Sequence, residues 1–367
     1  MIVLGDPVPR FSARSVQGAP VDLHVDAGRW VVLAFLGSPA EPRAREELAA
    51  LMSQAAFFST DRLVVYCIFG ERSDEIDGLA ACAGPALTFV ADYDGALARR
   101  FGAWGAPRTI VLDPMLRAIA DIGWDHPGGH GQMVAALLRG LPDVDDAAGV
   151  PLNAPVLIVP RVLDFDLCDL LVGIYDRLGG EDSGFLLDSG GKTATVVDHR
   201  LKRRQDMIIA APELRDTIRA RMVTRLLPEI ARYFQFEATR MDRYLVSCYD
   251  SATGGHFFRH RDNINAGAAH RRFAVTINLS KDYDGCDLVF PEFGRRTYRA
   301  PVGGAVVFSC GALHEVTPIT RGRRYAFIPF LYGEDDAARR KENNSRLHDG
   351  EALYRGEDDR LYPLAAE

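Results

Sequence analysis

The first 140 residues alternate continuous apolar runs with stretches of helical spacing. Four of the apolar runs have the length of buried strands: RWVVLAFLG at 29–37, RLVVYCIFG at 62–70, ALTFVAD at 86–92 and RTIVLDP at 108–114. The segment 41–58, between the first two runs, places apolar residues at helical intervals. Strands that alternate with helices are typical of a layered α/β structure around a mostly buried sheet.

The pattern changes at residues 140–155, which are rich in Pro, Gly and Asp and have no apolar period. We interpret this stretch as a linker. A helix is predicted at 164–180, with Asp164 as its cap and Gly179 as its stop. A longer helix is predicted at 212–235, and Pro228 is expected to kink it. Its buried stripe consists of Leu214, Ile218, Met222, Leu226 and Ile230.

From Arg243 onward the chain consists of short apolar runs: RYLVSCY, HFFRH, FAVTINLS, CDLVF, GAVVFS and RYAFIPFLY. Short strands with frequent turns predict a barrel or a sandwich. The charged end from Gly333 is compatible with a helix or with disorder. We therefore predict two domains and their connections, namely an α/β domain at 1–142, a linker at 143–154, a β-rich domain at 155–335 and a charged tail at 336–367.

Composition and charge narrow the functional classes. The chain has 367 residues, of which 47% are apolar and 25% charged, as in folded, soluble proteins. Its net charge of −7 argues against a nucleic-acid partner. The start MIVLGDPVPRF does not resemble a signal peptide, and no apolar window is long enough to cross a bilayer, so no membrane partner is expected. Six cysteines stand singly without a CxxC pair, which favours reduced thiols and a cytoplasmic location.

Two segments of the β-rich region carry residues suited to a metal site. Alternate residues of a strand point to the same side, so His260 and Asp262 can present an imidazole and a carboxylate to one point. His314, just past the run GAVVFS, can supply a second imidazole. Two histidines and one carboxylate leave coordination positions open, which suits non-haem Fe(II) better than structural zinc. The His-x-Asp at 24–26 has no matching partner in its own domain, and we interpret it as a surface turn.

An oxygenase with such a centre needs electrons, which 2-oxoglutarate usually supplies. The far carboxylate of that dianion suits an arginine, whose fork binds both oxygens. Arg324 lies ten residues after His314 at the start of RYAFIPFLY, so we predict it as the anchor, with Arg323 in reserve. Tyr249 is a candidate second donor to the same carboxylate, although a strand tyrosine is also a common core residue.

The order of these motifs resembles that of Fe(II)- and 2-oxoglutarate-dependent oxygenases of the prolyl 4-hydroxylase type, over residues 155–340. The matching segments are CY at 248–249, HRDN at 260–263, VTINLSKDYDGCDLVFPEFG at 275–294, HEVTP at 314–318 and RRY at 323–325. The resemblance implies a double-stranded β-helix (jelly roll) with supporting helices. It also implies iron ligands at His260, Asp262 and His314 and a 2-oxoglutarate base at Arg324. Two positions depart from the family: Gly285-Cys286 replaces a frequent Gly-Gly, and Phe257 replaces a frequent tyrosine.

The activity implied by this resemblance is that of a dioxygenase. It couples the oxidative decarboxylation of 2-oxoglutarate to succinate with hydroxylation of an unactivated C–H bond. The implied cofactors are Fe(II), 2-oxoglutarate and O2, with ascorbate as a further candidate. Asp262 stands where related halogenases leave room for chloride, which favours hydroxylation over halogenation. The substrate stays open between a peptidyl side chain and a small amino-acid-like or natural-product molecule.

Residues that would bind the substrate are weakly indicated. The basic stretch 195–207 is either a solvated strand or loop, or a rim of the active site. In the second case Arg203 and Arg204 would hold a carboxylate, a phosphate or an acidic peptide. Arg259 and Asn263, which flank the proposed ligands, are further candidates.

Residues 1–140 resemble peroxiredoxins of the thioredoxin fold, on the segments 5–23, 30–39 and 89–114. That family places its peroxide-attacking cysteine at a helix start, but GSPAEPRAREE after the first strand has no cysteine. We therefore expect a non-catalytic domain used for homodimerisation, substrate docking or scaffolding. Two other functions stay open: a thiol redox enzyme using Cys67 or Cys82, and a non-catalytic interaction protein.

Overall fold

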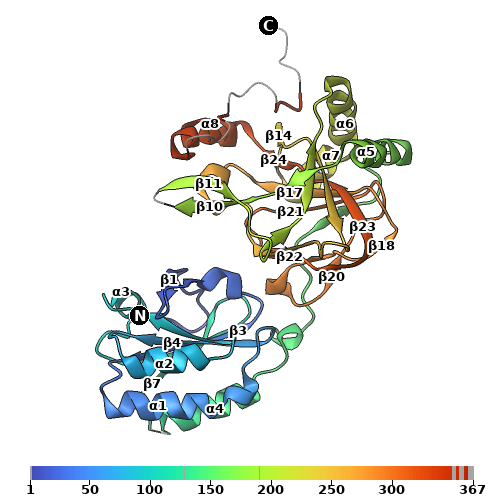
Figure 1. The fold of residues 1–367 in the computed structure, drawn as a ribbon. Coiled ribbons are helices and arrows are strands. Elements are labelled where there is room, and N and C mark those ends of the chain that lie inside the picture. Colours follow the sequence, from blue (N-terminus) through green and yellow to red (C-terminus); the bar gives the residue numbers. More distant parts are fainter. Residues whose placement is uncertain (1, 128, 190, 349–352, 355–358, 363–367) are drawn as a thin grey trace. The chain divides into compact units, whose positions relative to one another are not determined.

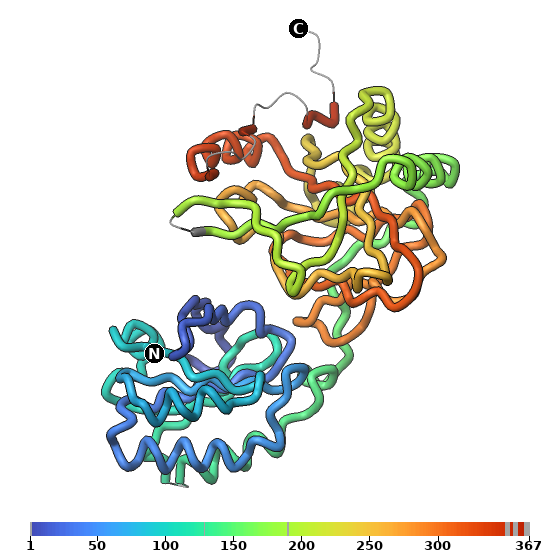
Figure 2. Tube along the Cα trace, viewed as in Figure 1, coloured from blue at the N-terminus to red at the C-terminus, as the bar shows by residue number. Residues whose placement is uncertain are grey.

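The computed structural model describes residues 2–127, 129–189, 191–348, 353–354 and 359–362 (Figures 1 and 2). Contacts divide the chain into two units. Unit 1 consists of Met1–Ala154 together with Phe290–Arg296, and unit 2 consists of Pro155–Val289 together with Thr297–Glu367. The domain boundaries drawn from the sequence stay predictions.

Unit 1 is built on one twisted sheet with the strand order β2-β1-β5-β4-β3-β6-β7. The strands are β1 (Ser12–Ser15), β2 (Pro20–Asp22), β3 (Trp30–Gly37), β4 (Leu63–Phe69), β5 (Leu87–Ala91), β6 (Arg108–Leu112) and β7 (Ala118–Gly123). The helices are α1 (Pro42–Met52), α2 (Asp74–Cys82), α3 (Ala96–Arg100) and α4 (His130–Gly140). Strands β3, β4 and β5 pair in parallel, as expected where helices connect them. The predicted α/β layer structure is confirmed.

The centre of this sheet is apolar along its whole length. Every residue of β4, and every residue of β3 except Gly37, is buried. Such continuous apolar runs are typical of strands covered on both faces. The stretch between β3 and α1 contains Ser38 and Pro39 but no cysteine.

Unit 2 is a double-stranded β-helix of antiparallel strands, which confirms the predicted jelly roll (Figure 1). Its ten-stranded sheet runs β14-β24-β17-β23-β15-β13-β9, with β18, β21 and β8 attached, and a five-stranded sheet runs β12-β16-β22-β19-β20. The strands of the larger sheet are β8 (Leu157–Val159), β9 (Glu181–Asp182), β13 (Gln205–Ile208), β14 (Arg240–Asp242), β15 (Leu245–Asp250), β17 (Phe273–Asn278), β18 (Tyr283–Gly285), β21 (Ala305–Ser309), β23 (Ile319–Phe327) and β24 (Phe330–Tyr332). Those of the smaller sheet are β12 (Lys202–Arg203), β16 (His256–His260), β19 (Leu288–Val289), β20 (Thr297–Tyr298) and β22 (His314–Val316). A separate hairpin joins β10 (Phe185–Ser189) to β11 (Lys192–Val196).

Helices cover one face of the larger sheet. They are α5 (Phe165–Leu178), α6 (Pro212–Arg225) and α7 (Leu227–Phe234), and α8 (Glu334–Glu342) follows the last strand. The predicted helix at 212–235 is thus two helices, and Pro228 lies in the first turn of the second, where its missing N–H costs nothing. The predicted stripe packs as expected, because Ile218, Met222, Leu226 and Ile230 are buried against Val246 and Cys248 of β15, with Leu214 at the edge.

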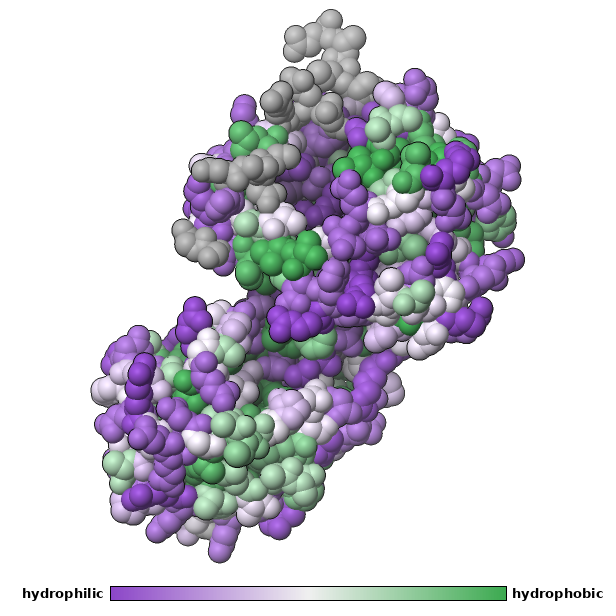
Figure 3. All heavy atoms as spheres, in the orientation of Figure 1, coloured by the Kyte–Doolittle hydropathy of each residue, from purple (hydrophilic) through white to green (hydrophobic). Residues whose placement is uncertain are grey.

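Short 3-10 helices complete the described chain: η1 (Leu23–Asp26), η2 (Ala55–Phe57), η3 (Val144–Asp146), η4 (Ala266–Ala268), η5 (Pro291–Phe293) and η6 (Asn343–Arg346). On the face drawn in Figure 3, hydrophilic side chains interleave with smaller apolar patches on both units. Among the residues described, no helix has the length and apolar character needed to span a bilayer.

Candidate metal centre and active site

The smaller sheet of unit 2 brings two histidines face to face. His260 ends β16 and is the register partner of His314, which begins β22. Asp262 follows His260 by two residues, and its backbone N–H donates to the carbonyl of Cys310 at 2.9 Å. An extended chain turns alternate side chains to the same side, so the Asp262 carboxylate reaches the space between the imidazoles.

The three side chains converge on one point. Asp262 Oδ1 lies 3.6 Å from His260 Nε2, and Asp262 Oδ2 lies 3.4 Å from His314 Nε2. One ligand atom of each residue lies within 4.8 Å of the others. The Nδ1 atoms donate to backbone carbonyls, that of His260 to Phe258 at 2.7 Å and that of His314 to Ala312 at 3.1 Å. These bonds fix the tautomers and leave both Nε2 lone pairs directed at the shared point.

Protonation states at this point also suit a cation. Burial raises the pKa of Asp262, but His314 and His260 more than offset it and hold that pKa well below its usual range. Burial and the neighbouring His260 lower the pKa of His314 to about 4. Asp262 is therefore ionised and His314 neutral at pH 7, which are the forms that bind metal. A facial set of two imidazoles and one carboxylate fits non-haem Fe(II).

A buried guanidinium lies on the opposite sheet. Arg324 on β23 is the register partner of Tyr249 on β15, and its guanidinium carbon lies 5.8 Å from the centre of the Tyr249 ring. Its Nη2 donates to Thr276 Oγ1 at 2.8 Å, and its Nη1 lies 4.0 Å from Cys286 Sγ. Arg324 is 6% exposed, and no described carboxylate forms an ion pair with it. A buried cation without a counter-charge is costly, so this position favours an anionic ligand.

Comparisons with known proteins assign both parts of the chain. Residues 244–332 match the 2OG-Fe(II) oxygenase superfamily, and residues 4–119 match the AhpC/TSA family. A PKHD-type hydroxylase of Maricaulis maris is 32% identical over 163 residues, which cover 43% of this chain and 70% of that protein. The chain belongs to the 2OG-Fe(II) oxygenase superfamily. Members are oxidoreductases, and the family implies Fe(II), 2-oxoglutarate and O2.

The chain is also similar to one further relative and to two solved structures. A PKHD-type hydroxylase of Hyphomonas neptunium is 26% identical over 197 residues, 50% of this oxygenase and 82% of the relative. Among solved structures, a prolyl-4-hydroxylase of Pseudomonas putida aligns with 51% of the chain and 95% of its own, at 20% identity and a TM-score of 0.38. A peroxidoxin of Mycobacterium tuberculosis aligns with 39% of the chain and 100% of its own, at 21% identity and a TM-score of 0.34.

The four residues suggested for substrate binding are not brought together in the oxygenase. Arg203 is exposed and donates to the Thr253 carbonyl at 2.6 Å. Arg204 is buried and paired with Asp206 at 2.7 Å. The others also have protein partners, since Arg259 pairs with Glu315 at 3.1 Å and Asn263 Nδ2 lies 3.4 Å from the Arg271 carbonyl. Their role in substrate binding stays a prediction.

Two further cations, which sequence reasoning passed over, also lie near the proposed ligands. Lys202 is buried, and its Nζ donates to Ser183 Oγ at 2.7 Å and lies 4.9 Å from the centre of the Phe257 ring. The Phe257 ring stacks on the imidazole of His260, with 3.5 Å between the two ring centres. Burial and Arg204 lower the pKa of Lys202 well below its ordinary value. Arg271 Nη1 donates to the Asp262 carbonyl at 3.4 Å. Lys202 could have been identified from the sequence. Only every second residue of a strand faces inward, so a position that turns Arg203 outward turns Lys202 inward.

Neither cysteine of the N-terminal unit lies at the start of a helix. Cys67 lies in the middle of β4 at 0% exposure, and burial raises its pKa to about 12. Cys82 is exposed at the end of α2. Arg108 is engaged by Asp121 at 3.0 Å. The expectation that the AhpC/TSA domain is not a peroxidase stays a prediction.

Proposed function

We propose that this protein is a hydroxylase in which His260, Asp262 and His314 hold Fe(II), and in which Arg324 and Tyr249 bind the far carboxylate of 2-oxoglutarate. One observation carries the proposal: three metal-ligating side chains converge within 4.8 Å in a β-helix that also holds a buried guanidinium without a described counter-charge. The proposed substrate is an unactivated C–H bond of a peptidyl side chain or of a small amino-acid-like or natural-product molecule.

The surrounding residues support this chemistry. When bound, Fe(II) would supply the reductive activation of dioxygen. The backbone carbonyls of Phe258 and Ala312 hold the two imidazoles in orientation. The Phe257 ring on His260 and the Phe308 ring, 4.6 Å from His314, exclude water from one side of the ligands. The Arg324 fork would bind a carboxylate in a bidentate manner and so orient the co-substrate.

An anaerobic titration tests the proposal. We expect metal-free protein to bind Fe(II) and then, with 2-oxoglutarate, to develop the visible charge-transfer band of the chelate. His260→Ala should lose both. His256→Ala is the matched control, because His256 lies on the same strand but bonds to the Gly254 and Arg200 carbonyls. Iron binding without the band would contradict the co-substrate assignment, and absence of iron binding would contradict the oxygenase proposal itself.

We further propose that ascorbate sustains repeated turnover and that the N-terminal unit forms a homodimer in a cytoplasmic compartment. The ascorbate and homodimer proposals rest on the family resemblance, and the cytoplasmic location rests on the six cysteines that stand singly. Succinate release over many turnovers with and without ascorbate tests the first. Light scattering of the full chain tests the second, and a monomer at micromolar concentration would contradict it.

A further inference from the structure

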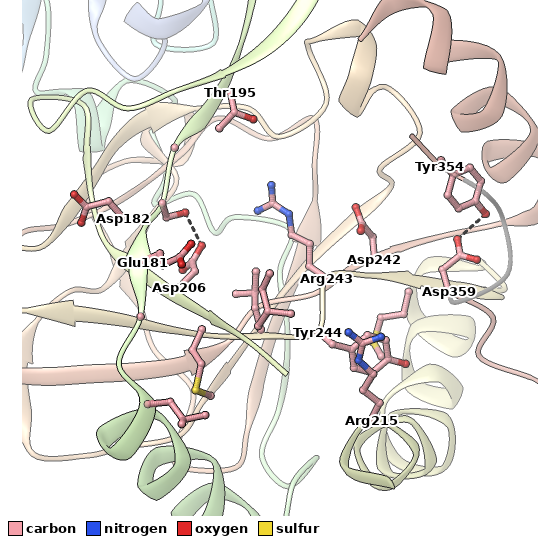
Figure 4. Close-up of a pocket in the computed structure, with 18 of the residues that line it drawn as sticks. Glu181, Asp182, Thr195, Asp206, Arg215, Asp242, Arg243, Tyr244, Tyr354 and Asp359 are labelled. Atoms are coloured by element: carbon pink, nitrogen blue, oxygen red, sulfur yellow. Dashed lines mark hydrogen bonds between the residues drawn. The ribbon is translucent and has the colours of Figure 1, made fainter. Parts of the chain in front are cut away.

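Unit 2 contains a cavity of about 970 Å³, which is at the upper end of the size of small-molecule sites (Figure 4). Its wall includes residues from β9, β13, the β14–β15 connection and β11. Side chains that matter for the argument are Asp206, Arg215, Asp242, Arg243 and Tyr244. Figure 4 shows the Arg243 side chain extending into the space between Asp206 and Asp242.

A chain of contacts connects the cavity to the segment that carries the proposed metal ligands. The guanidinium carbon of Arg243 lies 5.1 Å from the centre of the Phe330 ring, and that of Arg271 lies 4.0 Å from the same ring. Arg271 in turn donates to the carbonyl of Asp262. A single aromatic ring thus separates Arg243 from a residue that contacts the metal-ligand segment. The Arg243 side of the cavity is thus linked, through Phe330 and Arg271, to the segment that carries Asp262.

Arg243 differs from the other two arginines of the wall, Arg215 and Arg340, whose guanidinium groups donate hydrogen bonds. Asp206 pairs with Arg204 at 2.7 Å, and Asp242 pairs with Arg340 at 3.2 Å. Arg215 donates to the Ile209 carbonyl at 2.6 Å and stacks on Tyr244. The Arg243 guanidinium forms no hydrogen bond or ion pair with any residue that the structure describes. The acidic residues of β9, Glu181 and Asp182, are exposed at the rim, where water screens them.

The backbone of Arg243 is strained. Its φ is 67°, a left-handed conformation that costs a residue with a Cβ roughly 1–2 kcal/mol. A strained backbone conformation persists only where the surrounding structure holds it in place. Such residues are concentrated at functional sites. Here the strained backbone directs a guanidinium that has no hydrogen-bond or ion-pair partner among the described residues into a cavity. Burial and Arg271 lower the pKa of Arg243 to about 10, which leaves the guanidinium charged at neutral pH.

We propose that Arg243 binds a carboxylate of the substrate, so that the substrate of this oxygenase is an organic acid. The inference rests on the proposed function and names its substrate class. A guanidinium fork and a carboxylate form paired, charge-assisted hydrogen bonds, which fix orientation as well as supply affinity. The carboxylate belongs either to a free small acid or to an acidic side chain of a peptide, and the experiment distinguishes the two.

Anaerobic calorimetry on the full chain, loaded with Fe(II) and 2-oxoglutarate, provides the test. The probes are free L-amino acids and dicarboxylic acids, each paired with its amide, and end-capped peptides containing Asp or Glu, each paired with its Asn or Gln form. We expect at least one acid to bind more tightly than its amide. Arg243→Met should weaken that acid by roughly ten- to a hundredfold and remove the preference. Arg215→Met is the matched control, since Arg215 lines the same cavity with its guanidinium engaged.

Each result decides the question. No acid preferred over its amide in the wild type, or a preference retained in Arg243→Met, overturns the proposal. If Arg243→Met does not fold, Arg243→Gly removes the guanidinium and tolerates a φ of 67°. The charge-transfer band, measured in the same samples, tests the proposed function separately from the role of Arg243. Arg243→Met should retain the band at unchanged 2-oxoglutarate concentrations. Loss of the band in that variant would make Arg243 a co-substrate anchor and also overturn the proposal.

Discussion

Arg323 and Arg324 are neighbours in sequence but face opposite environments. Arg324 is buried against Thr276 and Tyr249, whereas Arg323 is exposed and pairs with Asp250 at 2.7 Å. We predict that Arg324→Met raises the 2-oxoglutarate concentration for half-saturation roughly a hundredfold, because a desolvated carboxylate loses its bidentate partner. Arg323→Met should change it less than about twofold, because exposed pairs contribute little. Spectroscopic titration of the chelate measures both, and equal effects of the two variants would contradict the assignment.

A second residue-scale prediction concerns the buried pair of Asp206 and Arg204. Burial raises the pKa of Asp206, but Arg204 more than offsets it and lowers that pKa to about 2. An unfolded aspartate titrates near 3.9, so the unfolded chain binds more protons between these values. The stabilisation is complete above about pH 4 and is lost as the pH falls through 2. We expect the difference in unfolding free energy between wild type and Asp206→Asn to shrink by about 2 kcal/mol from pH 5 to pH 2.

Hydrogen exchange of amides in unit 2 is the suitable measurement for this pair. The three tryptophans, Trp30, Trp104 and Trp124, all lie in unit 1, so tryptophan fluorescence does not report on unit 2. A difference between wild type and variant that stays constant with pH would show that Asp206 has no lowered pKa in the folded protein.

At the residue scale, the spacing of residues along strands predicted which side chains lie close together, but it did not predict the ion-pair partners of the arginines. His260 and Asp262 were singled out because alternate strand residues share a side, and the structure brings them together with His314. Charge alone did not show that Arg259 is held by Glu315, because this ion pair joins two distant segments of the chain. For the same reason Arg243 went unnoticed: its exceptional feature is a missing partner, which only the fold reveals.

At the scale of elements, helix α5 shows where local rules mislead. Its predicted end at Gly179 is correct, since this residue caps the helix with a φ of 75°. Asp164 occupies the predicted cap position, but its side chain makes no cap hydrogen bond. It pairs instead with Arg221 and Arg225 of α6, each at 2.7 Å. A tertiary ion pair has thus replaced the local bond that the sequence suggested.

The bend in β23 yields an element-scale prediction. Gly322 has a φ of 73°, and a Cβ there would lie 2.2 Å from the Asp282 carbonyl oxygen. We expect Gly322→Ala to destabilise unit 2 by about 3 kcal/mol, from backbone strain plus a clash that cannot relax. It should also weaken 2-oxoglutarate binding, because Arg324 lies two residues further along. Gly254→Ala is the control, since its φ is 75° but a Cβ there meets nothing within 4 Å, and about 1 kcal/mol is expected.

Hydrogen exchange in β18 and β23 measures this effect directly. Equal protection losses in Gly322→Ala and Gly254→Ala would mean that the close approach to Asp282 is relieved by a shift of the neighbouring backbone. In that case only the common conformational cost of a positive φ would remain.

At the scale of the whole molecule, the fold class of each unit could be predicted from the sequence. The grouping of distant segments into one unit could not. Continuous apolar runs indicated the α/β sheet of unit 1, and short runs with turns indicated the β-helix of unit 2. The grouping of Phe290–Arg296 with unit 1 had no such signal. Arg295 of this segment pairs with Asp143 at 2.8 Å and with Asp145 at 3.3 Å, and hydrophobic periodicity carries no information on pairs so far apart in sequence.

The last prediction concerns a chain that joins an oxygenase to an AhpC/TSA domain without a described reactive thiol. Cys67 is enclosed in β4 and its pKa is raised to about 12, so a thiolate is scarce at neutral pH. We expect no hydrogen peroxide consumption above the blank with a thiol reductant, and no difference between wild type, Cys67→Ser and Cys82→Ser. Succinate release should be unchanged in both variants. Peroxide turnover that is lost on replacing either cysteine would contradict this expectation and favour a thiol redox enzyme.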